Sequence, residues 1–338
     1  MMKNKTKAVG LLSGGLDSSL AAALMRHLGV KVYGMFFSLP WRCGKLRNAQ
    51  TVAEKLGITL KVEACREDYI DMVRHARYGY GAGLNPCIDC HLFMIKKAAA
   101  YMREIGADFV FTGEILGQRP LSQLKQSLRI IDEQCGLSGR LLRPLSAKLL
   151  DATAVETEGL VDREKLLGLS GRSRKDQYKL AEELGLKGYA APAGGCLLTE
   201  PNFGKRLKDL FDHGYRAWND LVILEWGRHF RLDPQFKAIV GRDEKENTQL
   251  IAHAHPEDYI LEMKVEPGPT VVLQSREAGA IVNEKILSRA AGLLKHFSRY
   301  RDQESATVIG WRTPGPKEIR EINVTSLSDS DVAGMWIQ

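Results

Sequence analysis

Short apolar runs alternate with amphipathic stretches over the first 200 residues of the chain. The apolar runs have the length of buried strands and lie at 7–12, 31–37, 58–64 and 108–112. Apolar residues at helical spacing lie between and after them, at 18–28, 49–56, 69–77, 94–105 and 173–185. Strands that alternate with helices predict an α/β fold, with a mostly parallel sheet covered by helices on both faces.

A different order of elements follows a boundary that we place between residues 200 and 225. Strands are predicted at 236–242, 259–265, 270–276 and 306–311, and helices at 244–254 and 284–299. This pattern predicts a smaller α+β domain. Residues 313–338 are polar, and we expect them to be loosely held. The expected division is therefore a first domain at 1–200, a linker at 201–227 and a second domain at 228–338.

The composition is that of a globular protein large enough for more than one core, with 338 residues, 44% hydrophobic and 26% charged. No apolar run approaches the length of a membrane span, and the basic start leads directly into LLSGGLDSS rather than a signal-peptide cleavage region. We therefore expect a cytoplasmic protein without membrane association. Structural disulfides are uncommon in that compartment, so we interpret Cys65 and Cys135 as packing residues and leave Cys43 open.

The positive charge is concentrated in the first part of the chain. The net charge is +7, and residues 1–200 hold 29 Lys and Arg against 21 Asp and Glu, whereas residues 201–338 hold 19 against 20. A positive excess suits a polyanionic partner such as nucleic acid. A solvated basic surface would give the same count, so charge alone leaves both interpretations open.

The stretch LLSGGLDSSL, at 11–20, carries the most specific chemistry in the sequence. The residues expected to bind a phosphate group there are Ser13, Gly14, Gly15, Asp17, Ser18 and Ser19. Glycines between a strand and a helix let the backbone approach an anion, and the helix N-terminus favours negative charge. Asp17 would repel phosphate unless a divalent ion lay between them, so we infer Mg²⁺. The alternative is an ordinary glycine-rich turn.

This stretch resembles the SGGxDS loop of the PP-loop ATP pyrophosphatases. Enzymes of that family adenylate a carbonyl oxygen with ATP and release pyrophosphate, and a nucleophile then displaces AMP. The segment FTGEILGQRPLSQLKQSL, at 111–128, is similar to a segment of tRNA 4-thiouridine synthases. That resemblance implies that Gly113, Gln118 and Gln123 line the nucleotide site, although the spacing between the two glutamines departs from the family pattern.

Residues 84–114, which begin LNPCIDCHLFMIKK, resemble the NPxxxCNxxIK segment of tRNA 2-thiouridine synthases. The resemblance implies a catalytic role for Cys90 and a nucleotide-site role for Lys96, while His91 replaces the usual Asn. A second catalytic cysteine in that family follows a small glycine-containing turn. The segment AGGCLLT supplies Cys196 in the corresponding place.

Several chemistries remain open for the pair of cysteines in CIDC. Structural zinc normally takes four ligands, a redox dithiol normally belongs to a thioredoxin-like unit, and two buried thiols can simply pack. The favoured interpretation, which several PP-loop thiolases suggest by resemblance, is a [4Fe–4S] cluster held by Cys87, Cys90 and Cys196, with one iron open to hydrosulfide. The alternative within the same function is a persulfide on Cys196 with Cys90 as the resolving thiol.

The second half resembles the RNA-binding domain of NFACT proteins over residues 228–312. This resemblance implies contact with tRNA or ribosomal RNA, and a packing or dimerisation domain is the alternative. The candidate phosphate contacts are Arg242, Lys245, Arg299 and Arg301, together with the basic loop GRSRKDQ at 171–177.

Together these features favour an ATP-dependent tRNA sulfurtransferase. Its partners would be tRNA and a sulfur donor, either sulfide or a cysteine desulfurase system. The loop begins at residue 13, without the RNA-binding module that precedes it in 4-thiouridine synthases and without an attached sulfurtransferase domain. We therefore expect RNA capture and sulfur delivery to be arranged differently. The alternatives are a PP-loop enzyme that acts on a small molecule and a nucleotide-binding RNA adaptor without catalysis, and the oligomeric state is open.

Overall fold

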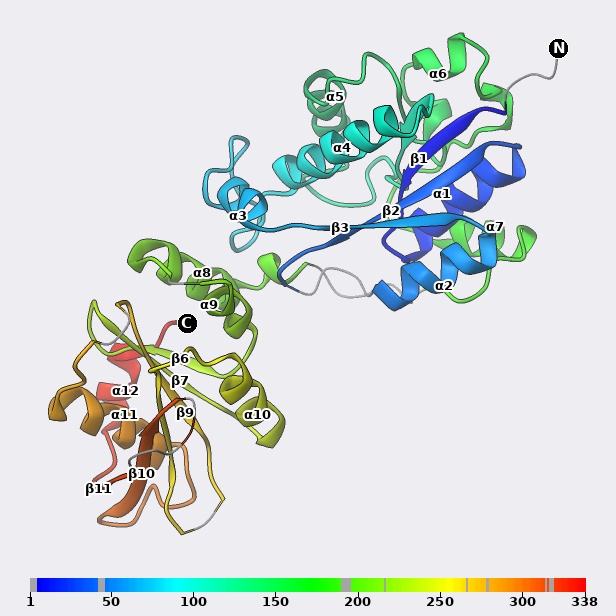
Figure 1. The fold of residues 1–338 in the computed structure, drawn as a ribbon. Coiled ribbons are helices and arrows are strands. Elements are labelled where there is room, and N and C mark those ends of the chain that lie inside the picture. Colours follow the sequence, from blue (N-terminus) through cyan, green and yellow to red (C-terminus); the bar gives the residue numbers. More distant parts are fainter. Residues whose placement is uncertain are drawn as a thin grey trace. The chain divides into compact units, whose positions relative to one another are not determined.

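The computed structural model describes residues 5–41, 46–189, 196–215, 217–265, 267–277, 280–313, 315 and 319–338. The chain divides into two compact units (Figure 1). The first unit contains Met1–Gly81 and Asn85–Leu197, and the second contains Ala82–Leu84 and Leu198–Gln338. Within the described ranges no helix is both long and apolar enough to cross a bilayer.

A parallel sheet of five strands forms the centre of the first unit. In spatial order its strands are β3 (Thr59–Ala64), β2 (Lys31–Ser38), β1 (Lys7–Leu11), β4 (Phe109–Phe111) and β5 (Leu141–Leu142). Every neighbouring pair is parallel, which confirms the predicted sheet. The sequence pattern did not indicate β5, because a strand of two residues is too short to show a period.

Helices cover both faces of this sheet (Figure 1). One face carries α1 (Leu16–His27), α2 (Leu46–Leu56) and α7 (Lys175–Glu183), and the other carries α3 (Glu67–Arg74), α4 (Cys87–Glu104) and α5 (Lys125–Gln134). Shorter turns are α6 (Ala154–Thr157) and the 3₁₀ segments Ala147–Leu149, Arg163–Lys165 and Leu197–Thr199. The layered α/β architecture expected from the alternating pattern is therefore present.

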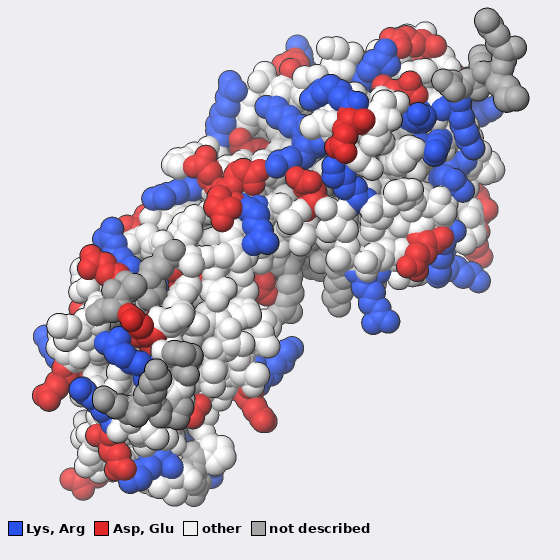
Figure 2. Space-filling view, viewed as in Figure 1, with Lys and Arg blue, Asp and Glu red and all other residues white. Residues whose placement is uncertain are grey.

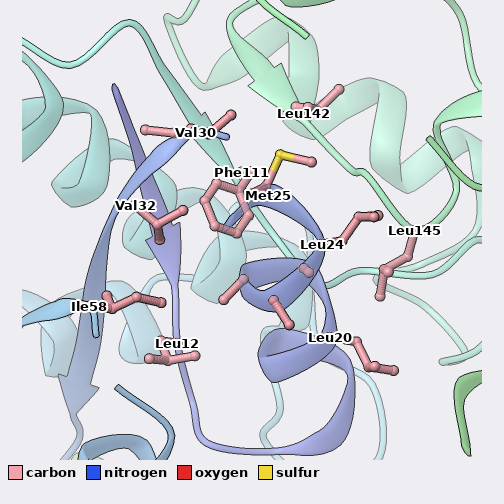
Figure 3. Packing of buried hydrophobic residues seen from close by; sticks show 14 of the residues in the cluster. Leu12, Leu20, Leu24, Met25, Val30, Val32, Ile58, Phe111, Leu142 and Leu145 are labelled. Atoms are coloured by element: carbon pink, nitrogen blue, oxygen red, sulfur yellow. The ribbon is translucent and has the colours of Figure 1, made fainter. Parts of the chain in front are cut away.

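The core beneath α1 shows why these residues fold together (Figure 3). Leu20, Leu24 and Met25 of α1 lie against Val32 of β2 and Phe111 of β4, and all five side chains are buried. Burying each large apolar side chain contributes roughly 1.5–3 kcal/mol relative to exposure. This packing fixes α1, and with it the loop that precedes the helix.

The structure corrects the prediction for the CIDC segment. We expected a loop followed by a helix near 94–105, but α4 begins at Cys87 and places both cysteines in its first turn. Pro86 stands at the N-cap, where its missing N–H costs no intrahelical hydrogen bond. Ile88, Leu92 and Ile95 are buried at helical spacing, so the packed face of the helix extends back to the cysteines.

The second unit is built on a six-stranded antiparallel sheet. In spatial order the strands are β11 (Arg320–Val324), β10 (Ala306–Arg312), β8 (Tyr259–Met263), β9 (Val271–Ser275), β7 (Phe236–Val240) and β6 (Arg228–Arg231). Its helices are α8 (Pro201–His213), α9 (Trp218–Val222), α10 (Glu244–His253), α11 (Glu284–His296) and α12 (Asp329–Met335), with a 3₁₀ turn at Ile223–Glu225. The expected linker at 201–227 is thus largely helical.

Alternation along the strands divides the second unit into two apolar layers. On β7, Ala238 and Val240 belong to one buried cluster, with α11, whereas Ile239 belongs to the other, with Leu250 of α10. A strand directs successive side chains to opposite faces, so this period of two indicates a sheet covered on both sides. The α+β character of the second domain is confirmed.

The end of the chain differs from the prediction that it is loosely held. Instead β11 pairs with β10, and Val324 and Val332 are buried in the core of the second unit. The ring of Trp336 lies 5.5 Å from that of Phe230 and 6.1 Å from that of Phe297. A polar segment anchored by a few apolar side chains has too little periodicity to be recognised from sequence.

Candidate active site

The glycine loop joins β1 to α1 and closes tightly at the start of the helix. Gly15 is the N-cap of α1, and its carbonyl oxygen accepts hydrogen bonds from the hydroxyls of Ser19 at 2.8 Å and Ser18 at 3.1 Å. Gly14 has φ +76°, and a Cβ there would lie 2.4 Å from the backbone nitrogen of Ala49. Only glycine fits, so the loop presents backbone and hydroxyl groups at a helix N-terminus, where anions bind favourably.

The turn after β4 packs directly against this loop. Strands β1 and β4 are neighbours in the sheet, so the segments that follow them meet at its carboxyl edge. A Cβ on Gly113 would lie 2.6 Å from the carbonyl oxygen of Asp17 and 2.6 Å from the amide nitrogen of Ser18. In open α/β sheets ligands bind at this edge, at the point where the strand order reverses. The structure thus brings two of the predicted segments together.

Asp17 has one satisfied and one unsatisfied carboxylate oxygen. Its Oδ2 accepts a hydrogen bond from Nε2 of Gln118 at 2.5 Å, whereas its Oδ1 is buried without a partner. Gln177 Nε2 donates in turn to Oε1 of Gln118 at 2.7 Å. Burial raises the pKa of Asp17, while the Gln118 hydrogen bond and the charges of Arg174 and Arg119 oppose that rise. A buried carboxylate oxygen without a donor fits a divalent cation, so this site agrees with the inferred Mg²⁺.

Gln123 and Lys96 do not contact the glycine loop directly. The Gln123 carbonyl accepts from the backbone N–H of Gly117 at 2.7 Å and its side-chain Oε1 from that of Arg119 at 3.1 Å. It therefore shapes the turn that presents Gln118. Lys96 lines a pocket of about 200 Å³ on α4, beside the buried Asp89. No contact of Lys96 with residues 13–19 is found in the described part of the first unit.

Two arginines and Gln177 are site residues that sequence reasoning missed. Arg174 is the N-cap of α7, and its Nε is buried without a hydrogen-bond partner. Arg119 follows Gln118 in sequence, and the charges of both arginines lower the pKa of Asp17. The basic loop 171–177 was the available signal, but we assigned it to RNA. The structure instead places Arg174 and Gln177 beside the glycine loop.

The three predicted cysteines lie in the same unit, and the charge of Cys196 acts on the thiols of both Cys87 and Cys90. The amide of Asn85 donates to Cys87 Sγ at 2.9 Å, and the Tyr69 hydroxyl lies 3.6 Å from Cys90 Sγ. Burial raises the pKa of the Cys87 thiol and raises that of Cys90 to about 12, and the charge of Cys196 raises both further. Arg119 acts in the opposite direction on Cys87. Both helical thiols are therefore protonated at neutral pH.

These positions lend no support to the predicted [4Fe–4S] cluster. Among the described residues, no group of three or more His, Cys, Asp or Glu side chains is placed to hold a metal ion. The three thiols are close enough for their charges to interact, yet they are not arranged as a ligand set. We therefore derive no step through a cluster. Cys65 and Cys135 are buried free thiols, and Cys43 lies outside the described residues.

A buried charge network supports the turn after β4. Glu114 accepts hydrogen bonds from Thr112 at 2.9 Å and Arg143 at 2.9 Å, and its other oxygen lies 2.6 Å from His91 Nδ1. Arg143 also donates to Asp132 at 2.6 Å. Burial alone would raise the pKa of Glu114, but Arg143 and His91 together lower it to about 2. His91 adjoins Cys90 in sequence and Glu114 adjoins Gly113, so the network links the cysteine helix to the loop.

Replacing Glu114 with Gln is expected to destabilise the first unit by about 3 kcal/mol at pH 7, because removing one partner of a buried ion pair leaves Arg143 undercompensated. The pKa of Glu114 is lowered from 4.5 to about 2, so its stabilisation is present above pH 4.5 and is lost as the pH falls toward 2. Urea unfolding at pH 7 and pH 3 measures both effects. The exposed Glu133, changed to Gln, is the control and should leave stability almost unchanged; equal loss in both variants would contradict the assignment.

The candidate phosphate contacts of the second unit are mostly engaged within the protein. Arg242 forms an ion pair with Glu246, and the guanidinium of Arg301 lies 2.6 Å from Asp329. Lys245 lies over the ring of Trp226, 5.9 Å from its centroid. The carbonyl oxygen of Pro267 is 3.5 Å from Arg299 Nη2. Each of these four side chains, predicted as a set, contacts a different partner.

The parallel sheet, the glycine loop at its carboxyl edge and the packed TGE turn define an α/β unit of the PP-loop type. Residues 4–152 match the family model described as "Thiamine biosynthesis protein (ThiI)", and residues 227–337 match "NFACT protein RNA binding domain". The second match confirms the resemblance to the NFACT RNA-binding domain. The first match, together with the curated relatives described next, confirms the resemblance to the tRNA thiouridine synthase branch of the PP-loop family.

The curated relatives are tRNA-specific 2-thiouridylases. A tRNA-specific 2-thiouridylase MnmA from Rippkaea orientalis is 30% identical over 233 residues, which is 65% of this chain and 62% of the relative. The MnmA of Caldicellulosiruptor saccharolyticus is 30% identical over 230 residues, or 60% and 58% of the two chains. The chain thus spans about three fifths of the length of these relatives. A solved 4-thiouridine synthetase–RNA complex with bound ATP is 20% identical with a TM-score of 0.37, covering 65% of this chain and 52% of the other.

Proposed function

We propose that the chain is an ATP-dependent tRNA sulfurtransferase, which adenylates a uridine carbonyl and replaces its oxygen with sulfur. The observation that carries this proposal is that consecutive residues of one turn act on both groups: Gln118 donates to Asp17 Oδ2 at 2.5 Å, and the charge of Arg119 acts on both Asp17 and Cys87. A nucleotide-type loop and a group of thiols are therefore neighbours within one unit. The similarity to tRNA thiouridylases and to an RNA-binding domain supports tRNA as the substrate.

In the first step a uracil carbonyl oxygen attacks the α-phosphorus of ATP. The bond from that phosphorus to the bridging oxygen breaks, pyrophosphate leaves, and the proton on N3 of the base is lost. The loop backbone, Arg174 and Arg119 are placed to stabilise negative charge on the phosphates, which is the main contribution expected in phosphoryl transfer. The unpartnered oxygen of Asp17 would hold Mg²⁺, which neutralises phosphate charge when bound.

In the second step sulfur replaces the activated oxygen. A cysteine desulfurase system would load Cys196 as a persulfide, whose terminal sulfur attacks the adenylated carbon and expels AMP with the former carbonyl oxygen. The base is then joined to Cys196 through a disulfide. The Cys90 thiolate attacks Cys196 Sγ, which leaves the sulfur and its electron pair on the base and forms a Cys90–Cys196 disulfide. An external dithiol supplies the two electrons that restore both thiols.

The domain assignment belongs to the same proposal. Residues 1–200 would carry adenylation and sulfur transfer, and residues 228–338 would bind tRNA, with 201–227 between them. The protein would act in the cytoplasm, where tRNA and a desulfurase system are both present. The basic balance of the first part, 29 Lys and Arg against 21 Asp and Glu, suits contact of that part with tRNA as well.

The full chain, incubated with unmodified tRNA, ATP, Mg²⁺, cysteine and a desulfurase, is expected to form one thiouridine for each AMP released. Nucleoside mass spectrometry measures the thiouridine, and labelled ATP measures AMP and pyrophosphate. Omitting tRNA should suppress AMP formation. AMP release that is independent of tRNA would favour a PP-loop enzyme acting on a small molecule, and binding of both ligands without AMP would favour a non-catalytic adaptor.

A further inference from the structure

Three arginines of the second unit converge on the chain segment at 224–228. Arg206 comes from α8 and donates from Nη1 to the carbonyl oxygen of Leu224 at 3.1 Å. Arg228 opens β6 and pairs in register with Val240 of β7. Arg242 follows β7 two residues later, so the antiparallel pairing of β6 with β7 brings it to the same end of the sheet as Arg228. The group is assembled by tertiary structure from three separate elements.

Glu246 is the carboxylate that this arginine group bonds to directly, and the charge of Asp243 also acts on Arg242. Glu246 accepts from Arg242 Nε at 2.8 and 2.9 Å, from the backbone N–H of Arg242 at 3.0 Å and from that of Gly227 at 3.2 Å. Its lone pairs are therefore committed to Arg242 and to the turn. Arg206 and Arg228 form no ion pair among the residues that the structure describes, although the charge of Glu246 acts on both. Three positive charges against those of Glu246 and Asp243 leave a net excess of one.

The arginines are partly buried. Burial strengthens the repulsion between their charges and so makes the binding of an anion more favourable. Burial lowers the pKa of Arg206 and of Arg228, and the charge of Arg242 lowers both further. Arg206 Nε is buried without a hydrogen-bond partner. Burial, with the charges of Lys237 and Arg206, keeps the pKa of the underlying His229 well below its usual value. Like charges held together in a medium of reduced dielectric repel each other unless a counter-anion binds.

Aromatic rings lie beside the arginine group. The guanidinium of Arg228 stands 4.8 Å from the centroid of Phe297, and Lys245 stands 5.9 Å from that of Trp226. Single-stranded nucleic acids are bound by cationic grooves that also offer aromatic faces for the bases. A site for free phosphate would need the cations alone. Phe297 packs in the α11 layer and Trp226 in the α10 layer, so the rings flank the arginine group from opposite faces of the sheet. The match to an RNA-binding domain favours RNA as the source of the phosphate.

The rest of this unit offers little general attraction for a polyanion. Residues 201–338 hold 19 Lys and Arg against 20 Asp and Glu. On the viewed face of the unit both signs are interspersed (Figure 2). Any electrostatic binding of nucleic acid must therefore be focused at a few sites. The match to an RNA-binding domain begins at residue 227, so it includes Arg228 and Arg242 but leaves out Arg206 of α8.

We propose that Arg206, Arg228 and Arg242 form a site for the phosphodiester backbone of RNA, with Trp226 and Phe297 beside it. The inference rests on the proposed function only in taking that RNA to be tRNA. The guanidinium groups supply directed donors for phosphate oxygens, and Glu246 holds Arg242 in place without neutralising the group. Contacts of this kind position the RNA and do not read its sequence.

Changing Arg228 to Gln in the full chain is expected to weaken tRNA binding about tenfold, the effect of losing one charged hydrogen bond. The slope of log affinity against log salt should become shallower by about one, because one fewer phosphate is neutralised. Arg228→Lys keeps the charge and should restore most of the slope. Arg320→Gln is the matched control, because Arg320 is an exposed arginine on β11, at the opposite edge of the sheet from β6.

Arg242→Gln should weaken binding more than Arg228→Gln, since it also leaves Glu246 uncompensated within the group. Equal thermal unfolding of the variants and the control keeps the comparison interpretable. If Arg228→Gln binds tRNA with the wild-type affinity and the wild-type salt dependence, the site is wrong. It is also wrong if inorganic phosphate competes for binding as effectively as an RNA oligonucleotide does. Thiolation by the wild type is scored separately: a protein that binds RNA through these arginines but forms no thiouridine contradicts the proposed function and leaves the site standing.

Discussion

Changing Asp17 to Asn is expected to abolish pyrophosphate release while leaving the first unit folded. The unpartnered Oδ1 of Asp17 is the oxygen that the structure offers to a cation beside the phosphates. Losing an electrostatic contact of this kind should lower the rate by a factor of about 10²–10³ or more. An asparagine side chain has the same shape and can still accept the hydrogen bond from Gln118. The loss would therefore be chemical rather than structural.

The stability of the same variant provides an independent check. Burial raises the pKa of Asp17, so the ionised carboxylate opposes folding, and stability falls as the pH rises through that pKa. Asp17→Asn removes this cost, and its unfolding temperature at pH 7 should equal or exceed that of the wild type. Asp176→Asn, at an exposed position of α7, is the control for both readouts. Pyrophosphate release near the wild-type rate in Asp17→Asn would show that the cation site lies elsewhere.

Changing Cys196 to Ser is expected to eliminate thiouridine formation while tRNA-dependent AMP release continues. Removing a nucleophile typically costs on the order of 10³-fold or more, and serine cannot carry a persulfide. Cys135→Ser is the control, because Cys135 is a buried free thiol that donates to the carbonyl oxygen of Asp132 at 3.3 Å. Separate assays of AMP and thiouridine measure the two steps. Normal thiolation by Cys196→Ser would rule out sulfur transfer through this residue.

The partner variant Cys90→Ser separates the persulfide route from a cluster. Without a resolving thiol, tRNA should accumulate as a disulfide adduct on Cys196 that a dithiol releases. In the wild type, burial raises the pKa of Cys90 to about 12, so its thiolate is scarce at neutral pH. The rate of the resolving step in the wild type should therefore increase about tenfold per pH unit from pH 7 to pH 9. Stoichiometric iron and sulfide in anaerobically purified protein, with no adduct, would contradict the persulfide route.

The local parts of the site could be predicted from sequence, and the parts assembled by tertiary contact could not. The loop at 13–19 is one continuous turn between a strand and a helix, so its glycines and hydroxyls are visible in order. Gln177 reaches Gln118 across 59 positions, and only the packing of α7 on α1 brings them together. The same limit applies to Arg174, whose basic neighbours suggested RNA rather than nucleotide phosphate.

The prediction of element boundaries failed where one residue type is typical of two different structures. The Asn-Pro pair before CIDC is typical of a turn, yet proline is also favoured at a helix start, and the structure uses the second property. At the other end of the chain, Trp336 anchors a segment that is otherwise polar. A single aromatic contact contributes nothing to a periodic pattern, although it determines where the segment packs.

The glycine loop is packed on two sides at separations where no side chain fits. Gly14 of the loop lies against the backbone of Asn48 and Ala49, and Gly113 lies against the backbone of Asp17 and Ser18. A phosphate bound at this loop would meet main chain packed against main chain, so few side-chain rotamers would become fixed on binding. A receptor whose shape exists before binding loses little conformational entropy on association. The nucleotide would then meet a rigid template, and selectivity among nucleosides would have to come from side chains beyond the phosphates.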